Sequence, residues 1–231
     1  MRDATREATS EGTMNEGAGA RTRVKICGIT RIEDGLAAGT RGADAIGLVF
    51  HPPSPRALDV DTAAAIRRAL PPFVTAVGLF VNAAPGTVVG TAERVGLDML
   101  QFHGDEPPEA CGEFGMPYIK AVRVDDAVDL RAYAQRYAGA AALILDTPDE
   151  KLWGGSGRTF DWDLVPADLA VPVVLAGGLT PENVAGAVRR LRPYAVDVSG
   201  GVEASPGIKD AGKIARFIDE VNRVSIAERT G

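Results

Sequence analysis

The sequence has few of the residues that build disulfide frameworks, metal sites or nucleic-acid interfaces. Its 231 residues include only two cysteines, Cys27 and Cys111, which lie far apart and form no CxxC pair. Neither a disulfide framework nor a zinc site is therefore expected. Acidic residues outnumber basic ones by 31 to 25, and the formal net charge is −6. Because a nucleic-acid-binding face needs an excess of lysine and arginine, this balance argues against such a partner.

Long apolar runs and targeting signals are also missing from the sequence. No stretch approaches the roughly 20 apolar residues of a membrane-spanning helix, so no membrane partner is expected. Residues 1–21 are polar and lack the basic-then-apolar order of a secretory signal. They are predicted to form a disordered N-terminal tail before a single domain at 22–231. With so few cysteines and no signal, the expected location is the cytoplasm.

From Arg23 onward, short β-branched and apolar runs alternate regularly with longer segments of helical period. The composition, 45% hydrophobic and 24% charged, is too apolar for a disordered chain and is typical of a globular one. Eight strands are predicted, at 23–27, 44–50, 73–81, 98–102, 117–122, 141–146, 171–177 and 194–199.

Helices are predicted between these strands. Thr30 and Glu33 have the spacing of a capping box, and Thr180 precedes a proline at a first helical position. Segments 129–138 and 210–223 place apolar residues three and four apart. Strand–helix alternation over eight units predicts a single α/β domain closed as a (β/α)₈ barrel. An open doubly wound sheet is the alternative, but the first strand is followed by CGIT and not by a GxGxxG fingerprint.

Polar residues collect where the predicted strands end, which is where a barrel of this kind carries its active site. They are Cys27, His51, Arg56, Asn82, His103, Arg123 and Asp146. Period-two alternation places Lys25 and Cys27 together on the inward face of the first strand, with Val24 and Ile26 outward. Since a buried ammonium needs a partner, Lys25 is expected to meet Asp197 or Asp146 across the barrel mouth.

Cys27 and Asp146 are the candidate proton carriers. A free thiol has a pKa of about 8.5, and nearby Lys25 should favour the thiolate, which could act as a base. Asp146 ends an apolar strand, where partial desolvation should help it keep a proton and act as an acid. Taken singly, the cysteine could be packing and the aspartate a turn cap. On opposite walls of one mouth, the two favour acid–base catalysis.

Glycine-rich loops follow the last two predicted strands. Gly177-Gly178 and Ser199-Gly200 offer bare backbone N–H groups of the kind that bind phosphate in barrels. Such glycines could instead only turn the chain, but their presence in both of the expected loops favours phosphate. A third cluster, at 153–164, is long enough to cover a site. Within it, Arg158 could contact phosphate or could be a solvated charge.

Four further residues carry weaker signals. Arg56 could bind a substrate carboxylate in a bidentate manner or could be an ordinary loop charge. His51 and His103 have no third ligand at metal-site spacing, so we expect hydrogen bonding near the mouth and no metal. Cys111 is predicted to pack in a helix.

Eight motifs, taken in order and spacing, resemble one enzyme family. They are VKICGIT, GLVFHPPSPR, VGLFVN, LQFHGDE, LILDT, GGSGRTFDW, AGGLTPENV and VDVSGGVEASPGIKD. From about Arg23 to Asn222 the chain closely resembles the phosphoribosylanthranilate isomerases of tryptophan biosynthesis.

This resemblance implies an Amadori rearrangement of N-(5-phosphoribosyl)anthranilate to 1-(o-carboxyphenylamino)-1-deoxyribulose 5-phosphate, without cofactor or metal. It implies Asp146 as the general acid that protonates the ribose ring oxygen and Cys27 as the general base that removes the C2 proton. Arg56 matches the residue that binds the anthranilate carboxylate, and Asp197 matches a carboxylate at the sugar. The candidate substrate-binding residues are Lys25, Arg56, His103 and Asp197, and the candidate phosphate-binding residues are Gly177, Gly178, Ser199 and Gly200.

Three residues differ from the family pattern, and two other functions are possible for such a barrel. Arg158, Gly200 and His51 stand where many relatives have lysine, serine and an aromatic residue, which bears on affinity more than on chemistry. A related isomerase of histidine biosynthesis would have aspartate in place of Cys27, and dual activity stays open. A non-catalytic barrel that binds phosphorylated metabolites would leave Cys27 and Asp146 without a purpose. The expected partner is a small phosphoribosyl substrate, bound by a monomer or a homodimer.

Overall fold

The computed structural model describes residues 21–125, 127–147 and 159–227. The predictions made for the tail before Arg21, and for Arg158 and most of its glycine cluster, therefore lie outside the described residues. Within the described residues no helix is long and apolar enough to cross a membrane.

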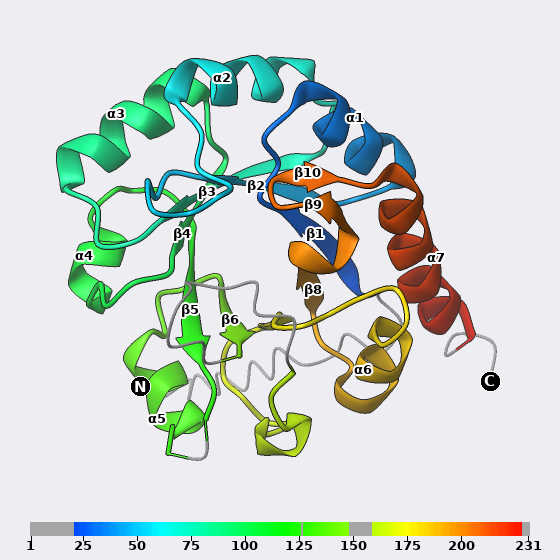
Figure 1. Cartoon of the computed structure of the whole chain (residues 1–231). Helices are drawn as coiled ribbons and strands as arrows, with labels where there is room; N and C mark the ends of the chain where they lie inside the picture. Colours follow the sequence, from blue (N-terminus) through cyan, green and yellow to red (C-terminus); the bar gives the residue numbers. More distant parts are fainter. Residues whose placement is uncertain (1–20, 126, 148–158, 228–231) are drawn as a thin grey trace, which may run out of the picture.

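Parallel strands close into a barrel in which each strand pairs with its neighbours along the chain and the last pairs back onto the first (Figure 1). The strands are β1 (Arg23–Cys27), β2 (Ala45–Val49), β3 (Thr75–Phe80), β4 (Met99–Phe102), β5 (Tyr118–Arg123), β6 (Ala142–Asp146), β7 (Val173–Leu175) and β8 (Ala195–Val198). Each overlaps one of the eight predicted runs, and the (β/α)₈ barrel is confirmed.

Helices surround this barrel (Figure 1). They are α1 (Ile32–Arg41), α2 (Val60–Ala69), α3 (Pro85–Val95), α4 (Pro108–Gly112), α5 (Leu130–Arg136), α6 (Val184–Leu191) and α7 (Ala211–Ala227). A 3₁₀ turn, η1 (Trp162–Leu164), lies between β6 and β7. After β8 come the 3₁₀ turn η2 (Gly200–Val202) and a small hairpin of β9 (Glu203–Ser205) and β10 (Ile208–Lys209).

Two apolar layers follow from the alternation of side chains along the strands. Val24 and Ile26 belong to the large layer between the strands and the helices. The inner layer fills the barrel with smaller residues, among them Val77, Ala121 and Ile144. The predicted faces of β1 are thus confirmed, since its outward residues pack under helices while Lys25 and Cys27 point inward.

The predicted capping box at α1 is wrong. The helix begins at Ile32 with Arg31 as its N-cap, and no side chain caps it. The hydroxyl of Thr30 instead donates a hydrogen bond to the carbonyl oxygen of Gly207, in the turn of the β9–β10 hairpin. A long-range contact therefore takes the group that the local pattern assigned to a cap, and it attaches the hairpin to the start of α1.

Other helix ends follow the sequence signals more closely. The carboxylate of Asp129 accepts hydrogen bonds from the N–H groups of Arg131 and Ala132, which begins α5 within the predicted segment. The hydroxyl of Thr180 accepts from the N–H of Glu182 and so starts the turn that leads into α6, although the helix proper begins at Val184.

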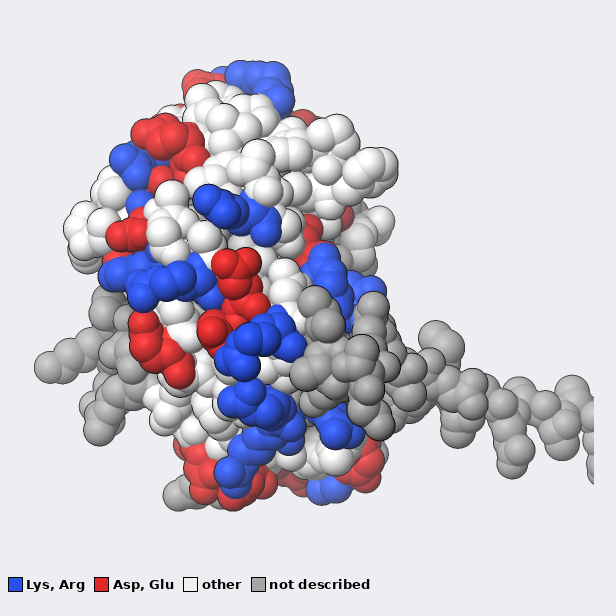
Figure 2. Space-filling model, turned by 90° about the vertical axis from the view of Figure 1, so that its right-hand side faces the viewer, with Lys and Arg blue, Asp and Glu red and all other residues white. Residues whose placement is uncertain are grey.

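The face of the molecule on the α7 side is shown in Figure 2. Lysine and arginine lie intermixed there with aspartate and glutamate. Arg223 pairs with Glu220 on α7, and Arg216 of α7 lies 3.9 Å from Glu182. Exposed pairs of this kind contribute little to stability but distribute charge of both signs over the surface.

Candidate active site

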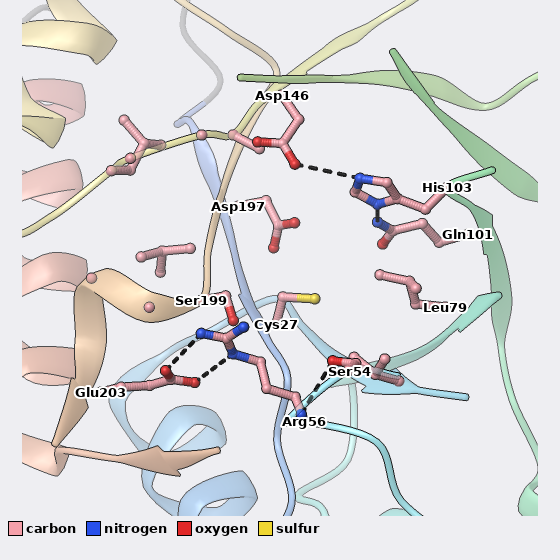
Figure 3. A pocket seen from close by; sticks show the side chains of 18 of the residues that line it. Cys27, Ser54, Arg56, Leu79, Gln101, His103, Asp146, Asp197, Ser199 and Glu203 are labelled. Atoms are coloured by element: carbon pink, nitrogen blue, oxygen red, sulfur yellow. Dashed lines mark hydrogen bonds and ion pairs between the residues drawn. The ribbon is translucent and has the colours of Figure 1, made fainter. Parts of the chain in front are cut away.

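A cavity of about 380 Å³ opens at the carboxyl ends of the strands (Figure 3). Every predicted site residue except Lys25 lines it. Those residues are Cys27, Arg56, His103, Asp146, Asp197, Gly177, Gly178, Ser199 and Gly200. The strand-end rule predicted this edge of the barrel, and the alternation rule predicted the inward direction of Cys27, but neither rule fixes the position of a loop residue such as Arg56.

Lys25 lies beneath the cavity floor and does not contact its space. Its side chain is 6% exposed, and its ammonium nitrogen is 3.0 Å from Oδ1 of Asp197, so the expected carboxylate partner is confirmed. Burial lowers the pKa of Lys25, but the charges of Asp197 and Cys27 outweigh burial and raise it. Lys25 therefore stays an ammonium held under the two groups that face the cavity.

Cys27 faces the cavity beside this ammonium. Room for both comes from Gly47 on β2, where a Cβ atom would lie 2.7 Å from the cysteine sulfur and 3.1 Å from the lysine nitrogen. Burial raises the pKa of the Cys27 thiol, and Lys25 lowers it only in part, so that the net shift is upward. Lys25 thus favours the thiolate, as expected, but desolvation by burial outweighs its effect and the thiolate stays the minor form.

Asp146 ends β6 on the opposite wall (Figure 3). Its Oδ1 accepts the N–H of Thr147 at 2.8 Å, and its Oδ2 lies 3.4 Å from Nε2 of His103. Nδ1 of the same imidazole lies 3.2 Å from the amide nitrogen of Gln101. Asp146 is thus held from β4, and not by Lys25.

Arg56 lies at the edge of the cavity in a network of buried charges. Its Nε and Nη2 each lie 2.8 Å from one carboxylate oxygen of Glu203. The ammonium of Lys209 is also 2.8 Å from Glu203 Oε1. The hydrogen bonds to Glu203 raise the pKa of Arg56, and Arg56 and Lys209 together hold the pKa of Glu203 below its usual value despite burial. The bidentate edge of Arg56 is therefore occupied by Glu203.

The two predicted phosphate loops face the cavity side by side. Gly177 and Gly178 both have positive φ values, 77° and 63°, which favour glycine because other side chains rarely adopt them. In the second loop, a Cβ atom at Gly201 would clash with the carbonyl oxygen of Leu179 in the first. Glycine thus lets the backbones after β7 and β8 approach each other closely.

Several cavity residues were missed by the sequence analysis. Gln101 lies two positions before His103 on the same face of β4, so the alternation rule could have found it. Ser54 and Glu203 come from loops, and no periodic pattern places loop side chains. Glu203 stands 147 positions from its partner Arg56, and the sequence analysis gave it no role although it named Asp197, Ser199 and Gly200 in the same motif.

Cys111 packs as predicted. It is fully buried on α4, its thiol donates to the carbonyl oxygen of Glu106, and burial raises its pKa to about 11. Asn82 follows β3 and Arg123 is the last residue of β5, but neither lines the cavity. Among the described residues, no three histidine, cysteine, aspartate or glutamate side chains gather as a metal site would need.

Comparison with known proteins gives one consistent family. Residues 24–220 match the family model described as N-(5'phosphoribosyl)anthranilate (PRA) isomerase. A curated N-(5'-phosphoribosyl)anthranilate isomerase from Pseudomonas aeruginosa is 59% identical over 199 residues, which are 86% of this chain and 94% of the relative.

Solved structures agree with the sequence comparison. The phosphoribosyl anthranilate isomerase of Thermotoga maritima has a TM-score of 0.81 at 43% identity, covering 87% of this chain and 99% of its own. A phosphoribosyl anthranilate isomerase in complex with reduced 1-(o-carboxyphenylamino)-1-deoxyribulose 5-phosphate has a TM-score of 0.79 at 42% identity, with the same coverage. The chain therefore belongs to the N-(5'-phosphoribosyl)anthranilate isomerase family.

Proposed function

We propose that Cys27 and Asp146 carry the proton transfers by which this chain isomerises N-(5'-phosphoribosyl)anthranilate, the reaction of its family in tryptophan biosynthesis. The observation that supports this most directly is that a thiol from β1 and a carboxyl group from β6 face one cavity whose rim is formed by two glycine loops. An acid and a base on opposite walls can act on different atoms of the same sugar.

The substrate has three chemically distinct parts, and the cavity offers a matching group for each. Its phosphate fits the loops of Gly177-Gly178 and Ser199-Gly200, where backbone N–H groups are free of side-chain cover. Its carboxylate fits Arg56, and its sugar hydroxyls fit Asp197. Because Glu203 holds Nε and Nη2 of Arg56, we assign the contact with the substrate carboxylate to the remaining nitrogen, Nη1. The product analogue bound in the related solved structure carries the same three parts.

Ring opening is the first chemical step. Asp146 gives its proton to the ribose ring oxygen while the bond between that oxygen and C1 breaks. The bonding electrons stay on the oxygen, and the lone pair of the anthranilate nitrogen forms a C=N bond, giving a protonated Schiff base. Asp146 is then a carboxylate, accepting the N–H of Thr147.

Proton removal from C2 follows. The Cys27 thiolate takes this proton, and the electrons of the C–H bond form a C1=C2 double bond while the iminium nitrogen becomes neutral. The resulting enolamine then loses its hydroxyl proton and gains one at C1, which yields the ketone. The reaction needs no oxidant, since every electron pair stays within the substrate.

Replacing each proton carrier tests these roles. We expect Cys27→Ser and Asp146→Asn each to lower kcat by about 10²–10⁴-fold, followed through the loss of substrate fluorescence. Cys111→Ser is the matched control, because it makes the same exchange at a buried thiol on α4 that lines no part of the cavity. Near wild-type turnover in Cys27→Ser or Asp146→Asn would remove that residue from its assigned role.

The substrate class and the cellular location are part of the same proposal. A small phosphorylated metabolite is the partner that the cavity fits, and the cytoplasm is where we expect the chain to meet it. Whether it acts there as a monomer or a homodimer is a matter for sedimentation in solution.

A further inference from the structure

A row of three polar side chains crosses from β4 to β6 at the cavity wall (Figure 3). Gln101 is 1% exposed, His103 is 7% exposed and Asp146 is 6% exposed. The amide nitrogen of Gln101 lies 3.2 Å from Nδ1 of the imidazole, and Nε2 lies 3.4 Å from Asp146 Oδ2. The contacts of the imidazole ring therefore run to one neutral group and one acidic group.

The chemistry of the amide decides where the ring carries its proton. In the amide orientation that the structure has, the nitrogen of Gln101 faces Nδ1 and can only donate, so in this orientation Nδ1 accepts and holds no proton. The single proton of the neutral ring is then on Nε2, directed at Asp146. A doubly protonated ring would bring the N–H of Nδ1 against the N–H of Gln101 unless the amide turned to present its Oε1, which has no hydrogen-bond partner among the described residues.

We propose that Gln101 is a positioning residue that keeps His103 neutral, with its proton on Nε2, as a hydrogen-bond donor to Asp146. This inference rests on the proposed role of Asp146 as the acid. It also gives His103 a task other than the substrate binding that the sequence suggested, since the imidazole acts through the acid and not on the sugar.

The benefit of a neutral donor follows from the order of charges in the reaction. Once Asp146 has given up its proton, a carboxylate remains at a buried position and needs donors on both oxygens. The N–H of Thr147 donates to Oδ1, and Nε2 of His103, 3.4 Å from Oδ2, is the nearest group that could donate to the second oxygen. A neutral donor gains most as the charge develops. An imidazolium would instead hold Asp146 ionised beforehand, so that no proton would be available for the ring oxygen.

Charges of both signs lie near the His103 imidazole. A second cavity, of about 190 Å³, is lined by His103 together with Asp105 and Arg123, which carry opposite charges. Cys27 and Asp197 line the main cavity together with His103. The neutral amide of Gln101 is the group in direct contact with Nδ1, and it is the one that selects the tautomer.

The tautomer can be read in the resting enzyme. The sequence has only two histidines, His51 and His103, so long-range ¹H–¹⁵N spectra of the imidazoles are simple and His51→Asn assigns them. We expect His103 at neutral pH to be uncharged with its proton on Nε2. A proton on Nδ1, or on both nitrogens, would overturn the inference. Because no substrate is present, this result is independent of whether Cys27 and Asp146 are the catalytic pair.

Activity then tests whether the tautomer matters. Gln101→Glu places an acceptor with negative charge against Nδ1, so the ring should gain a proton there, and kcat should fall by about 10²-fold with a smaller change in KM. Gln135→Glu is the control, since it makes the same exchange on an exposed residue of α5 and should leave kcat and the ring spectrum unchanged.

Two outcomes in this variant would contradict the inference. One is a His103 ring that still carries only the Nε2 proton in Gln101→Glu, and the other is unchanged kcat despite a proton on Nδ1. If Gln101→Glu fails to fold, the wild-type spectrum still decides. Full activity of Asp146→Asn would instead remove the proposed function while leaving the tautomer as observed.

Discussion

At the scale of single residues, the Cys27 thiol is where burial and charge oppose each other most directly. Lys25 is near enough to favour the thiolate, yet its ammonium also lies 3.0 Å from Asp197. The negative charge of Asp197 therefore offsets part of the effect of Lys25, and it also disfavours a thiolate at Cys27. The thiol is consequently the dominant form near neutrality, and the reactive thiolate is a minor one.

This balance predicts the titration of the thiol. We expect the Cys27 thiolate to form only above the ordinary cysteine pKa of about 8.5, because burial raises its pKa more than Lys25 lowers it. In Lys25→Met the pKa of Cys27 should rise further, because Lys25 lowers this pKa in the wild-type protein. Ultraviolet absorbance of the thiolate measures both.

The titration needs one background variant and one blank. Cys111→Ser removes the other thiol, and Cys27→Ser with Cys111→Ser provides the spectrum without either. A thiolate that is already fully formed at neutral pH would show that the effect of Lys25 outweighs desolvation.

Sequence reasoning was sufficient for side-chain direction and insufficient for side-chain environment. Alternation along β1 and β6 placed Cys27 and Asp146 in one cavity, because a strand repeats every two residues whatever surrounds it. The sign of the thiol's pKa shift depends on how completely neighbours exclude water, which no spacing records. The contact of Glu203 with Arg56 likewise depends on where two loops meet.

At the scale of elements, the close approach of the loops after β7 and β8 is fixed by glycine. We expect Gly201→Ala to lower kcat/KM by about 10²-fold, the effect of displacing binding groups by about 1 Å. The reason is that its Cβ would clash with the carbonyl oxygen of Leu179, so one loop must move away from the other. Steady-state kinetics over a range of substrate concentrations measures the change.

The control for this variant is Gly90→Ala. Gly90 is an exposed residue of α3, and a Cβ atom there meets nothing within 4 Å. Its kcat/KM should match wild type, and its stability should rise by up to about 1 kcal/mol because alanine favours a helix. Equal kinetics in Gly201→Ala and Gly90→Ala would mean that the spacing of the two loops does not matter for the substrate.

The elements themselves show which local signals are dependable. Eight apolar runs predicted eight strands, because a barrel strand is buried on both faces and is apolar over its length. The capping signal at Thr30 failed because the β9–β10 hairpin, which the sequence analysis did not predict, takes its hydroxyl. The short elements after β8 are held by contacts with distant residues, and they are too short to show a periodic pattern in the sequence.

At the scale of the whole molecule, one buried ion pair joins β5 to the segments that follow β3 and β4. Lys120 points outward from β5 and is fully buried. Its ammonium donates to the carbonyl oxygen of Gly104 at 2.6 Å and to Glu106 Oε2 at 2.9 Å. Glu106 in turn accepts the N–H groups of Asn82, after β3, and of Gly104. The network therefore fixes the loop that directly follows His103.

Removing the cation should destabilise the entire barrel. We expect Lys120→Met to lower the free energy of unfolding by about 3–5 kcal/mol, the usual cost of leaving one partner of a buried pair uncompensated. Urea unfolding should show a lower midpoint with an unchanged m-value. Arg131→Met is the matched control, because its ion pair with Asp168 is exposed and solvent screens it, so its midpoint should stay near that of wild type. Equal midpoints in the two variants would show that Lys120 contributes no more than a surface charge. A lower midpoint in Lys120→Met with wild-type kcat below the transition would show that the network stabilises the barrel and that the loop after His103 does not affect turnover.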